Sequence, residues 1–209
     1  MSAHLEYLEL PAERNPSGCV VALHGRGVDG EDLMPLAAML DFASLRFVFP
    51  HAPLEAEFGG RAWYPLTSES HEAILKSRNF LLELIRTIEK QGTPAAMIAL
   101  MGFSQGGVMS LDAGLRYPKR LAGVASLSGY LHDPEHLATE KGEIAGLPVF
   151  IAHGTADDVL PVSGSRQAAK LLQGTGVAVT YKEYPIGHQI IPEEIDDLRV
   201  FLKSCFPSV

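Results

Sequence analysis

Three types of side chain in this sequence could together carry out nucleophilic catalysis. Ser104 lies within Gly102-Phe-Ser-Gln-Gly106, and His188 lies further along the chain. A serine hydroxyl is a weak nucleophile at neutral pH, so a histidine has to accept its proton and return it to the leaving group. A carboxylate has to orient the imidazole, and Asp157 and Asp158 both lie between the serine and the histidine. The chain therefore holds candidates for a nucleophile, a base and an acid.

The stretch around Ser104 predicts a sharp turn between a strand and a helix. The apolar run 97–101 is typical of a strand that is buried on both faces, and residues 105–116 are compatible with a helix. Between them, Gly-x-Ser-x-Gly is the pattern of a nucleophile elbow. Backbone N–H groups at the start of such a helix can hold an oxyanion. The chain has 20 glycines, so the pattern could arise by chance, and Ser104 could simply cap a helix.

The rest of the chain alternates strands and helices with short polar joints. This alternation, with continuous apolar strands, predicts an α/β fold with a mostly parallel sheet of about seven strands and helices on both faces. Two longer joints, 50–67 and 128–148, are too short to form a lid domain. The expected strands are 4–10, 19–23, 45–49, 97–101, 122–127, 149–152 and 177–184, and the expected helices are 31–40, 70–90, 105–116, 166–172 and 191–205.

The polar residues that could take part in a reaction follow directly after the predicted strands. In a parallel sheet, chemistry gathers at the carboxyl ends of the strands, and His24, Ser104, His153 and His188 all lie there. The order serine, acid, histidine along the chain is that of the α/β-hydrolase triad, and it differs from the orders in other serine-protease folds. The context of Ser104 therefore favours a catalytic role.

Composition limits the class of protein. A chain of 209 residues with 46% hydrophobic content can bury one substantial core, so we expect residues 1–209 to form a single domain. The net charge of −8, without a cluster of Lys or Arg, argues against nucleic acid or an anionic membrane as partner. No apolar run resembles a signal peptide or a membrane span. Cys19 and Cys205 are interpreted as buried free thiols, which fits a cytoplasmic protein.

Four motifs in the chain form a recognisable set. They are Leu23-His-Gly-Arg-Gly27, Gly102-Phe-Ser-Gln-Gly-Gly107, His153-Gly-x-x-Asp157 with Pro161 behind it, and Gly187-His188. With these motifs the chain resembles the phospholipase/carboxylesterase family of the α/β-hydrolase superfamily, which includes acyl-protein thioesterases. The resemblance implies hydrolysis of a small ester or acyl thioester, or of an acylated protein, without a cofactor or a metal.

The resemblance also implies the catalytic roles. Ser104 would be the nucleophile, His188 the base and Asp157 the acid, with Asp158 as the rival acid. The oxyanion donors would be the backbone N–H groups of Arg26 and Gln105. Many relatives carry an apolar residue at the position of Arg26. Because the donor is backbone, the role should survive, although the polarity of the pocket changes.

Several residues keep two interpretations. Phe58, Trp63, Leu66 and Leu160 are candidate walls of an open acyl groove, while Trp63 and Phe58 could equally be loop anchors. His24 and His153 are expected to make structural hydrogen bonds. His132 and His136 could bind a metal, but a solvated acidic segment is the expected interpretation. Lysophospholipid, lactone or peptide hydrolysis, and a non-catalytic binding scaffold, remain as alternative functions.

Overall fold

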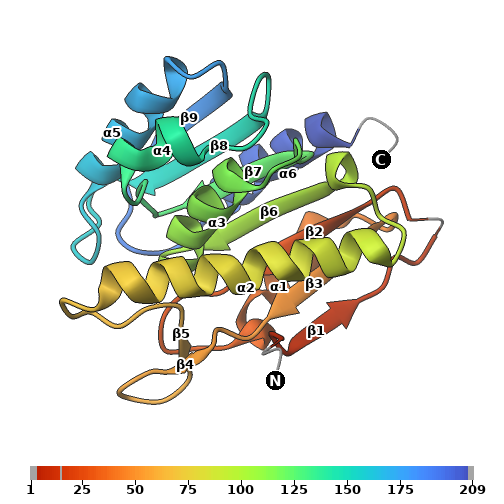
Figure 1. Ribbon diagram of the computed structural model, residues 1–209, viewed down its shortest axis with the longest axis horizontal. Helices are drawn as coiled ribbons and strands as arrows, with labels where there is room; N and C mark the ends of the chain where they lie inside the picture. Colours follow the sequence, from red (N-terminus) through yellow and green to blue (C-terminus); the bar gives the residue numbers. More distant parts are fainter. Residues whose placement is uncertain (1–3, 15, 207–209) are drawn as a thin grey trace.

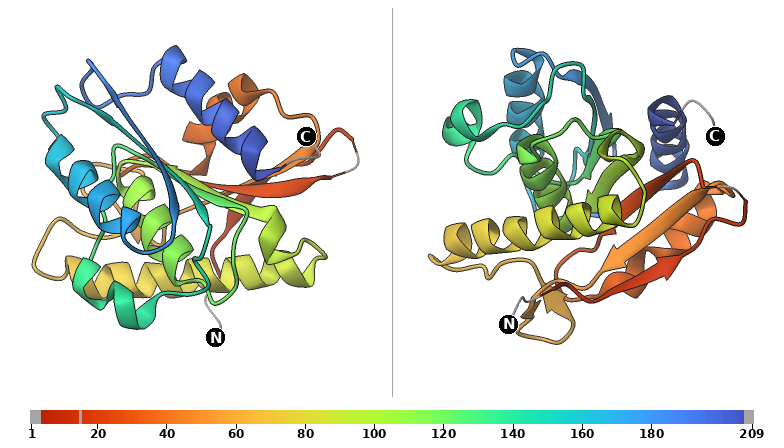
Figure 2. Two further views of the ribbon diagram at one scale, coloured as in Figure 1. Left: turned by 90° about the horizontal axis from the view of Figure 1, so that it is seen from above. Right: turned by 45° about the vertical axis from the view of Figure 1, so that its right-hand side comes forward.

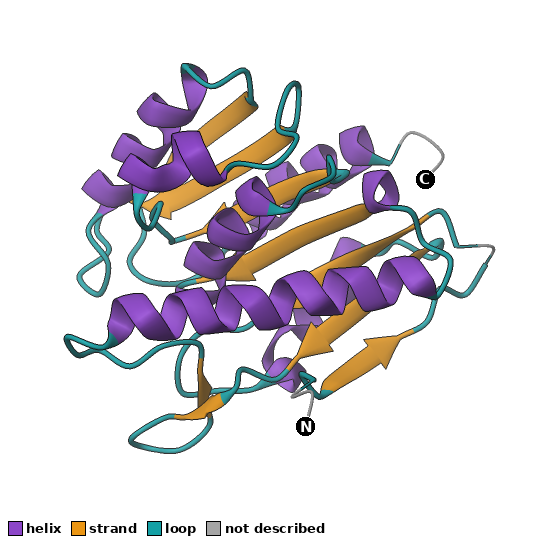
Figure 3. Ribbon diagram, in the orientation of Figure 1, coloured by secondary structure: helices purple, strands orange, loops and turns teal. Residues whose placement is uncertain are grey.

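The protein folds around one seven-stranded sheet (Figures 1 and 3). The computed structural model describes residues 4–14 and 16–206. The strands lie in the order β1-β3-β2-β6-β7-β8-β9, and only the edge strand β1 runs antiparallel to its neighbour. This arrangement confirms the predicted mostly parallel sheet. The strand bounds are β1 Tyr7–Leu10, β2 Gly18–Leu23, β3 Leu45–Pro50, β6 Ile98–Phe103, β7 Gly123–Leu127, β8 Pro148–Gly154 and β9 Ala178–Tyr184.

Helices cover both faces of the sheet (Figure 2). Alternate residues of β6 supply two separate cores: Ile98 and Leu100 face one, and Ala99 and Met101 face the other. The first core packs against α2 Ser70–Lys90, α3 Gln105–Arg116, α4 Pro134–Glu140 and α5 Val162–Gln173; the second packs against α1 Met34–Leu40 and α6 Pro192–Cys205.

The two long joints contain structure that the sequence pattern does not predict. The loop after β3 carries a small antiparallel hairpin, β4 Leu54–Glu55 and β5 Arg61–Ala62. The joint between β7 and β8 carries α4. Two short 3₁₀ helices, η1 Gly30–Leu33 and η2 Ala95–Met97, include residues 31–33 of the expected helix 31–40 and residue 97 of the expected strand 97–101. Elements of two to seven residues span too few periods for a reliable hydrophobic pattern.

A buried network of ion pairs ties three helices together. The Asp112 carboxylate on α3 is fully buried and accepts hydrogen bonds from Arg78 of α2 at 2.6 and 3.0 Å and from Arg116 at 2.7 Å. Arg78 and Arg116 both also donate to Glu140 of α4, at 3.0 and 2.9 Å. Removal of one partner of such a network leaves a buried charge without compensation. The network therefore holds α3, which follows Ser104 directly, against its neighbours.

The strand register brings the predicted site residues to one edge of the sheet. Leu23 at the end of β2 pairs with Gly102, and Phe103 at the end of β6 pairs with Leu127. The residues that follow these strands therefore share the carboxyl edge, as expected. Cys19 and Cys205 are buried free thiols. No helix within the described residues has the length and apolarity that a membrane crossing requires.

Candidate active site

Ser104 occupies the turn between β6 and α3 with a positive φ angle. Its φ is 56° and its ψ is −121°, a strained combination for a residue with a side chain. The two flanking glycines make this turn possible because, without a Cβ, their backbone can come close to neighbouring carbonyl groups. A Cβ on Gly106 would lie 1.9 Å from the Leu23 carbonyl oxygen, and a Cβ on Gly102 would lie 2.3 Å from the Gly106 carbonyl oxygen. The Gly-x-Ser-x-Gly spacing is thus required by the packing of the elbow against β2.

Hydrogen bonds join Ser104, His188 and Asp157 in one line. His188 Nε2 lies 2.9 Å from Ser104 Oγ, and His188 Nδ1 lies 2.6 Å from Asp157 Oδ2. A carboxylate only accepts, so Nδ1 carries the proton and leaves the Nε2 lone pair for the serine hydroxyl. Phe103 packs against the imidazole, with ring centroids 4.8 Å apart. The arrangement can move a proton from Ser104 to His188.

Asp157 is the better placed of the two candidate acids. Its side chain is fully buried, and its Oδ1 accepts the backbone N–H groups of Val159 and Leu160 at 2.9 and 2.8 Å. Burial opposes ionisation, but the hydrogen bonds from His188 and from these N–H groups outweigh it and lower the pKa of Asp157. Asp157 therefore stays a carboxylate at neutral pH. Asp158 is exposed.

His24 and His153 make structural hydrogen bonds, as the sequence analysis expected. The Nε2 of His24 accepts the backbone N–H of Ala52 at 3.0 Å. His153 Nε2 lies 2.8 Å from the Leu160 carbonyl oxygen, to which it donates, and 3.2 Å from Asp157 Oδ2. The two histidines thereby fix loops at the carboxyl edge of the sheet, and His153 braces the loop that holds Asp157.

The loop that carries Arg26 is held beside Ser104 by backbone pairing to the hairpin. Gly27, with a φ of 87°, donates its N–H to the Arg61 carbonyl oxygen at 2.9 Å, and the Arg61 N–H donates to the Val28 carbonyl oxygen at 2.8 Å. On the other side, the Gln105 N–H belongs to the first turn of α3, where N–H groups lack acceptors within the helix. Both backbone N–H groups predicted as oxyanion donors thus lie on segments that flank Ser104.

The Gln105 and Trp63 side chains join these two segments, a role that sequence reasoning missed. Gln105 Oε1 accepts the Trp63 backbone N–H at 3.0 Å, and its Nε2 donates to the Tyr64 carbonyl oxygen at 2.8 Å. The Trp63 indole N–H donates to the His24 carbonyl oxygen at 2.9 Å. The lone tryptophan in a loop next to the site was the available signal, because a buried indole N–H requires an acceptor.

The four candidate groove residues do not lie together. Phe58 and Leu66 are 90% and 70% exposed and line, with Arg26, a cavity of about 430 Å³. Trp63 is 0% exposed and belongs to the core, so it is a loop anchor and not a groove wall. Leu160 is half-buried on the loop after Asp157 and is absent from the lining of this cavity. Arg26 and Glu57, which both line this cavity, approach one another at 3.9 Å between Nη2 and Oε2.

The histidines considered for a metal have other partners. His132 Nε2 lies 3.0 Å from His71 Nδ1, while His136 Nδ1 lies 2.7 Å from Asp133 Oδ1. Hydrogen bonding to Asp133 raises the pKa of His136. Within residues 4–14 and 16–206, no three His, Cys, Asp or Glu side chains are grouped as metal ligands.

The helix that follows His188 contains a buried acid that should make stability depend on pH. Glu194 on α6 is 1% exposed, and burial raises its pKa to about 7, only partly offset by the Ile191 N–H. Between the usual glutamate pKa and 7, the folded protein binds a proton that the unfolded chain has released, so stability falls as pH rises through this window. Glu194→Gln should raise the free energy of unfolding at pH 8 by about 1–3 kcal/mol and change it little at pH 5.

Urea unfolding of both proteins at pH 5 and pH 8 measures this difference. Glu193→Gln, which alters an exposed acid in the same helical turn, is the matched control and should leave the pH dependence unchanged. An equal stability change at both pH values for Glu194→Gln would contradict the expected titration.

The chain is similar to known esterases and thioesterases over most of its length. The phospholipase/carboxylesterase family profile matches residues 9–206. The chain is 32% identical to acyl-protein thioesterase 1 of Emericella nidulans, with 95% of each chain covered. It is 31% identical to a probable carboxylesterase of Oryza sativa subsp. japonica, with 90% of this chain and 88% of that protein covered. The crystal structure of esterase PE8 superimposes with a TM-score of 0.91 at 31% identity, covering 97% of this chain and 100% of that chain.

Proposed function

The chain belongs to the phospholipase/carboxylesterase family, and from this premise we propose that Ser104, His188 and Asp157 hydrolyse short- to medium-chain esters or thioesters through an acyl-enzyme. Ester or thioester hydrolysis by an α/β-hydrolase is the activity that the related proteins support. The observation that carries the finer proposal is the line of hydrogen bonds from Ser104 Oγ through His188 to Asp157, at 2.9 and 2.6 Å.

The first half of the proposed reaction forms an acyl-enzyme. His188 Nε2 takes the Ser104 proton as Oγ attacks the carbonyl carbon of the substrate. Asp157 stabilises the imidazolium that results, and its carboxylate is available because hydrogen bonding lowers its pKa. When the tetrahedral intermediate collapses, His188 returns the proton to the leaving alcohol or thiol. The acyl group is then an ester of Ser104.

The second half releases the acid by the same groups. His188 removes a proton from a water molecule that attacks the acyl-enzyme, and it then protonates Ser104 Oγ as the acyl group leaves as a carboxylic acid. In both halves, negative charge develops on the carbonyl oxygen. The Arg26 and Gln105 backbone N–H groups are the proposed donors to it, and loss of one such donor typically costs about 10²–10³ in rate.

The groove beside the site supports substrates with short to medium acyl chains. Two of its apolar side chains, Phe58 and Leu66, lie mostly in solvent, and the two long joints, 50–67 and 128–148, hold a two-stranded hairpin and α4 instead of a lid domain. Each added methylene contributes about 0.8 kcal/mol only while it still contacts apolar wall. The proposed acyl donor is a small ester or thioester, or a protein that carries an acyl group, as the names of the related thioesterases suggest.

A panel of acyl chain lengths tests the proposed groove. Catalytic efficiency on p-nitrophenyl esters, and on matched thioesters, should rise from acetyl to medium chains and then level off or fall, without a jump at the micelle concentration. Leu66→Ala and Phe58→Ala should lower the efficiency for medium chains about three- to tenfold and leave acetyl turnover nearly unchanged, because a short acyl group does not reach them.

Val200→Ala is the matched control, since Val200 is 69% exposed on α6. A maximum at palmitate with activation at an interface would contradict an open groove. Absence of turnover on every ester and thioester, together with no labelling of Ser104 by a fluorophosphonate probe, would favour a binding scaffold. Preferential turnover of a lysophospholipid, lactone or peptide would change the substrate class and keep the proposed chemistry.

A further inference from the structure

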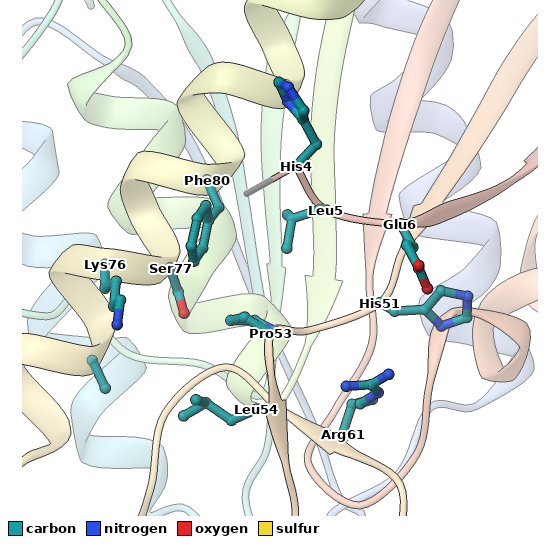
Figure 4. Close-up of a pocket in the computed structure, with 11 residues that line it drawn as sticks. His4, Leu5, Glu6, His51, Pro53, Leu54, Arg61, Lys76, Ser77 and Phe80 are labelled. Carbon is teal, nitrogen blue, oxygen red and sulfur yellow. The ribbon is translucent and has the colours of Figure 1, made fainter. Parts of the chain in front are cut away.

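A second cavity of about 410 Å³ lies behind the hairpin that borders the acyl groove. The hairpin separates the two cavities: Leu54 lines both, while Arg61 faces this one and its neighbour Ala62 faces the groove. Successive residues of a strand point to opposite faces, so the two side chains of β5 line different cavities. The other walls come from residues 4–6, from the loop that follows β3 and from α2 (Figure 4).

The lining combines an apolar wall with an excess of positive charge. Leu5, Pro53, Leu54 and Phe80 supply the apolar wall, and Figure 4 shows the Arg61 side chain extending toward His51 on the other side. Arg61 and Lys76 are the basic side chains, whereas Glu6 is the one carboxylate among the lining residues that the structure describes. The Arg61 guanidinium has no ion pair with any described residue.

This combination suits a small ligand with one negative charge and an alkyl chain. A guanidinium binds a carboxylate through two parallel hydrogen bonds. A dianionic phosphate would meet stronger repulsion from Glu6 than a carboxylate does. The volume lies near the lower end of the roughly 300–1,000 Å³ range of ligand pockets, which limits the length of the chain.

The cavity is connected to the oxyanion loop through two of its lining residues. The backbone of Arg61 makes both hydrogen bonds that hold Gly27 and Val28. Further along the loop, the Gly30 N–H donates to His51 Nδ1 at 3.2 Å. A ligand that orders the side chains of Arg61 and His51 therefore acts on the residues that fix this loop.

We propose that this cavity is a second binding site, distinct from the acyl groove, for a short- or medium-chain alkyl carboxylate. The carboxylate lies on the Arg61 guanidinium, and the alkyl chain lies along Leu5, Pro53 and Phe80. Carboxylates of this class are what ester or thioester hydrolysis releases, so the site can sense product. Recognition itself depends on the charge and shape of the cavity and does not require Ser104 to be the nucleophile.

Binding is measured in Ser104→Ala protein, which separates it from turnover. Hexanoate carries both chemical features, acetate carries only the charge, and hexan-1-ol carries only the chain. Titrations followed by amide NMR should show saturable hexanoate binding with shifts at Gly27, Val28, Gly30 and Arg61. Affinity should increase about three- to fourfold per methylene from butyrate to hexanoate, and acetate and hexan-1-ol should bind at least tenfold more weakly than hexanoate.

Variants separate this cavity from the groove. Arg61→Met should weaken hexanoate at least tenfold and leave hexan-1-ol within twofold, while Phe80→Ala should weaken both. Arg120→Met removes an exposed arginine close to the amino end of β7 and should change nothing. Circular dichroism verifies that each variant is folded. Two results would overturn the proposal. The first is hexanoate affinity that is unchanged in both Arg61→Met and Phe80→Ala. The second is hexanoate affinity that is lost in Leu66→Ala but kept in Arg61→Met.

Discussion

Ser104→Ala is expected to lower kcat for ester hydrolysis by about 10⁴–10⁶ and to leave the protein folded. The variant removes the only atom that can form the acyl-enzyme, while the proposed oxyanion donors and the substrate groove remain. The residual rate would then come from binding and from these donors acting on an attacking water molecule. Alanine keeps the Cβ, so the strain of the elbow, with φ at 56°, is unchanged and the free energy of unfolding should shift little.

The measurement is kcat on a short p-nitrophenyl ester, with unfolding followed by circular dichroism. Ser110→Ala provides the matched control, because Ser110 is a buried serine of α3, the helix that follows Ser104, and its hydroxyl donates to the Gly106 carbonyl oxygen at 2.9 Å. That carbonyl lies inside α3, and alanine is a better helix former than serine, so the control should keep its activity within a few-fold. Activity of folded Ser104→Ala within tenfold of the wild type would refute the assignment of the nucleophile.

Asp157→Asn is expected to lower kcat by about 10⁴ with little change in KM. The carboxylate accepts from His188 Nδ1 at 2.6 Å and thereby leaves Nε2 free to accept the Ser104 proton. An asparagine amide can instead donate a hydrogen bond to Nδ1, and the imidazole proton then lies on Nε2. In that tautomer Nε2 is a donor and cannot accept the proton of Ser104. The substitution also removes the negative charge that stabilises the imidazolium.

Asp158→Asn is the control that decides between the two neighbouring acids. Asp158 is exposed, so its substitution should change kcat less than threefold. Steady-state kinetics of the two variants on one ester measure the contrast. A large loss in Asp158→Asn and a small loss in Asp157→Asn would transfer the role of the acid to Asp158.

The amino-acid pattern was sufficient to predict the fold, and it indicated the three side chains, Ser104, His188 and Asp157, that the structure brings within hydrogen-bond distance of one another. Buried parallel strands need continuous apolar runs, so the order of β2, β3, β6, β7 and β8 along the chain can be predicted locally. The elbow is also local, because Gly102, Ser104 and Gly106 meet within one turn. The chain order of the triad then connects these local signals to one edge of the sheet.

What the sequence could not determine depends on contacts between residues far apart along the chain. Trp63 is a large apolar side chain that would suit a groove wall, yet it is buried in the core, where its indole N–H donates to the His24 carbonyl oxygen. The side-chain bonds of Gln105 to Trp63 and Tyr64 cross about forty positions of the chain. The motif resemblance favoured Asp157 over Asp158, but the contact itself, with Asp157 Oδ2 2.6 Å from His188 Nδ1, joins residues 31 positions apart.

The sequence by itself determined a parallel α/β sheet with a serine elbow and with a histidine and an acid at its carboxyl edge, because periodicity and tight turns are properties of short segments. Only the tertiary structure decided how the hairpin Leu54–Ala62 divides the space beside that edge into two cavities. Two-residue strands carry no period of their own, and their position is set by the pairing of Arg61 with Val28 across a loop that only the folded chain brings near.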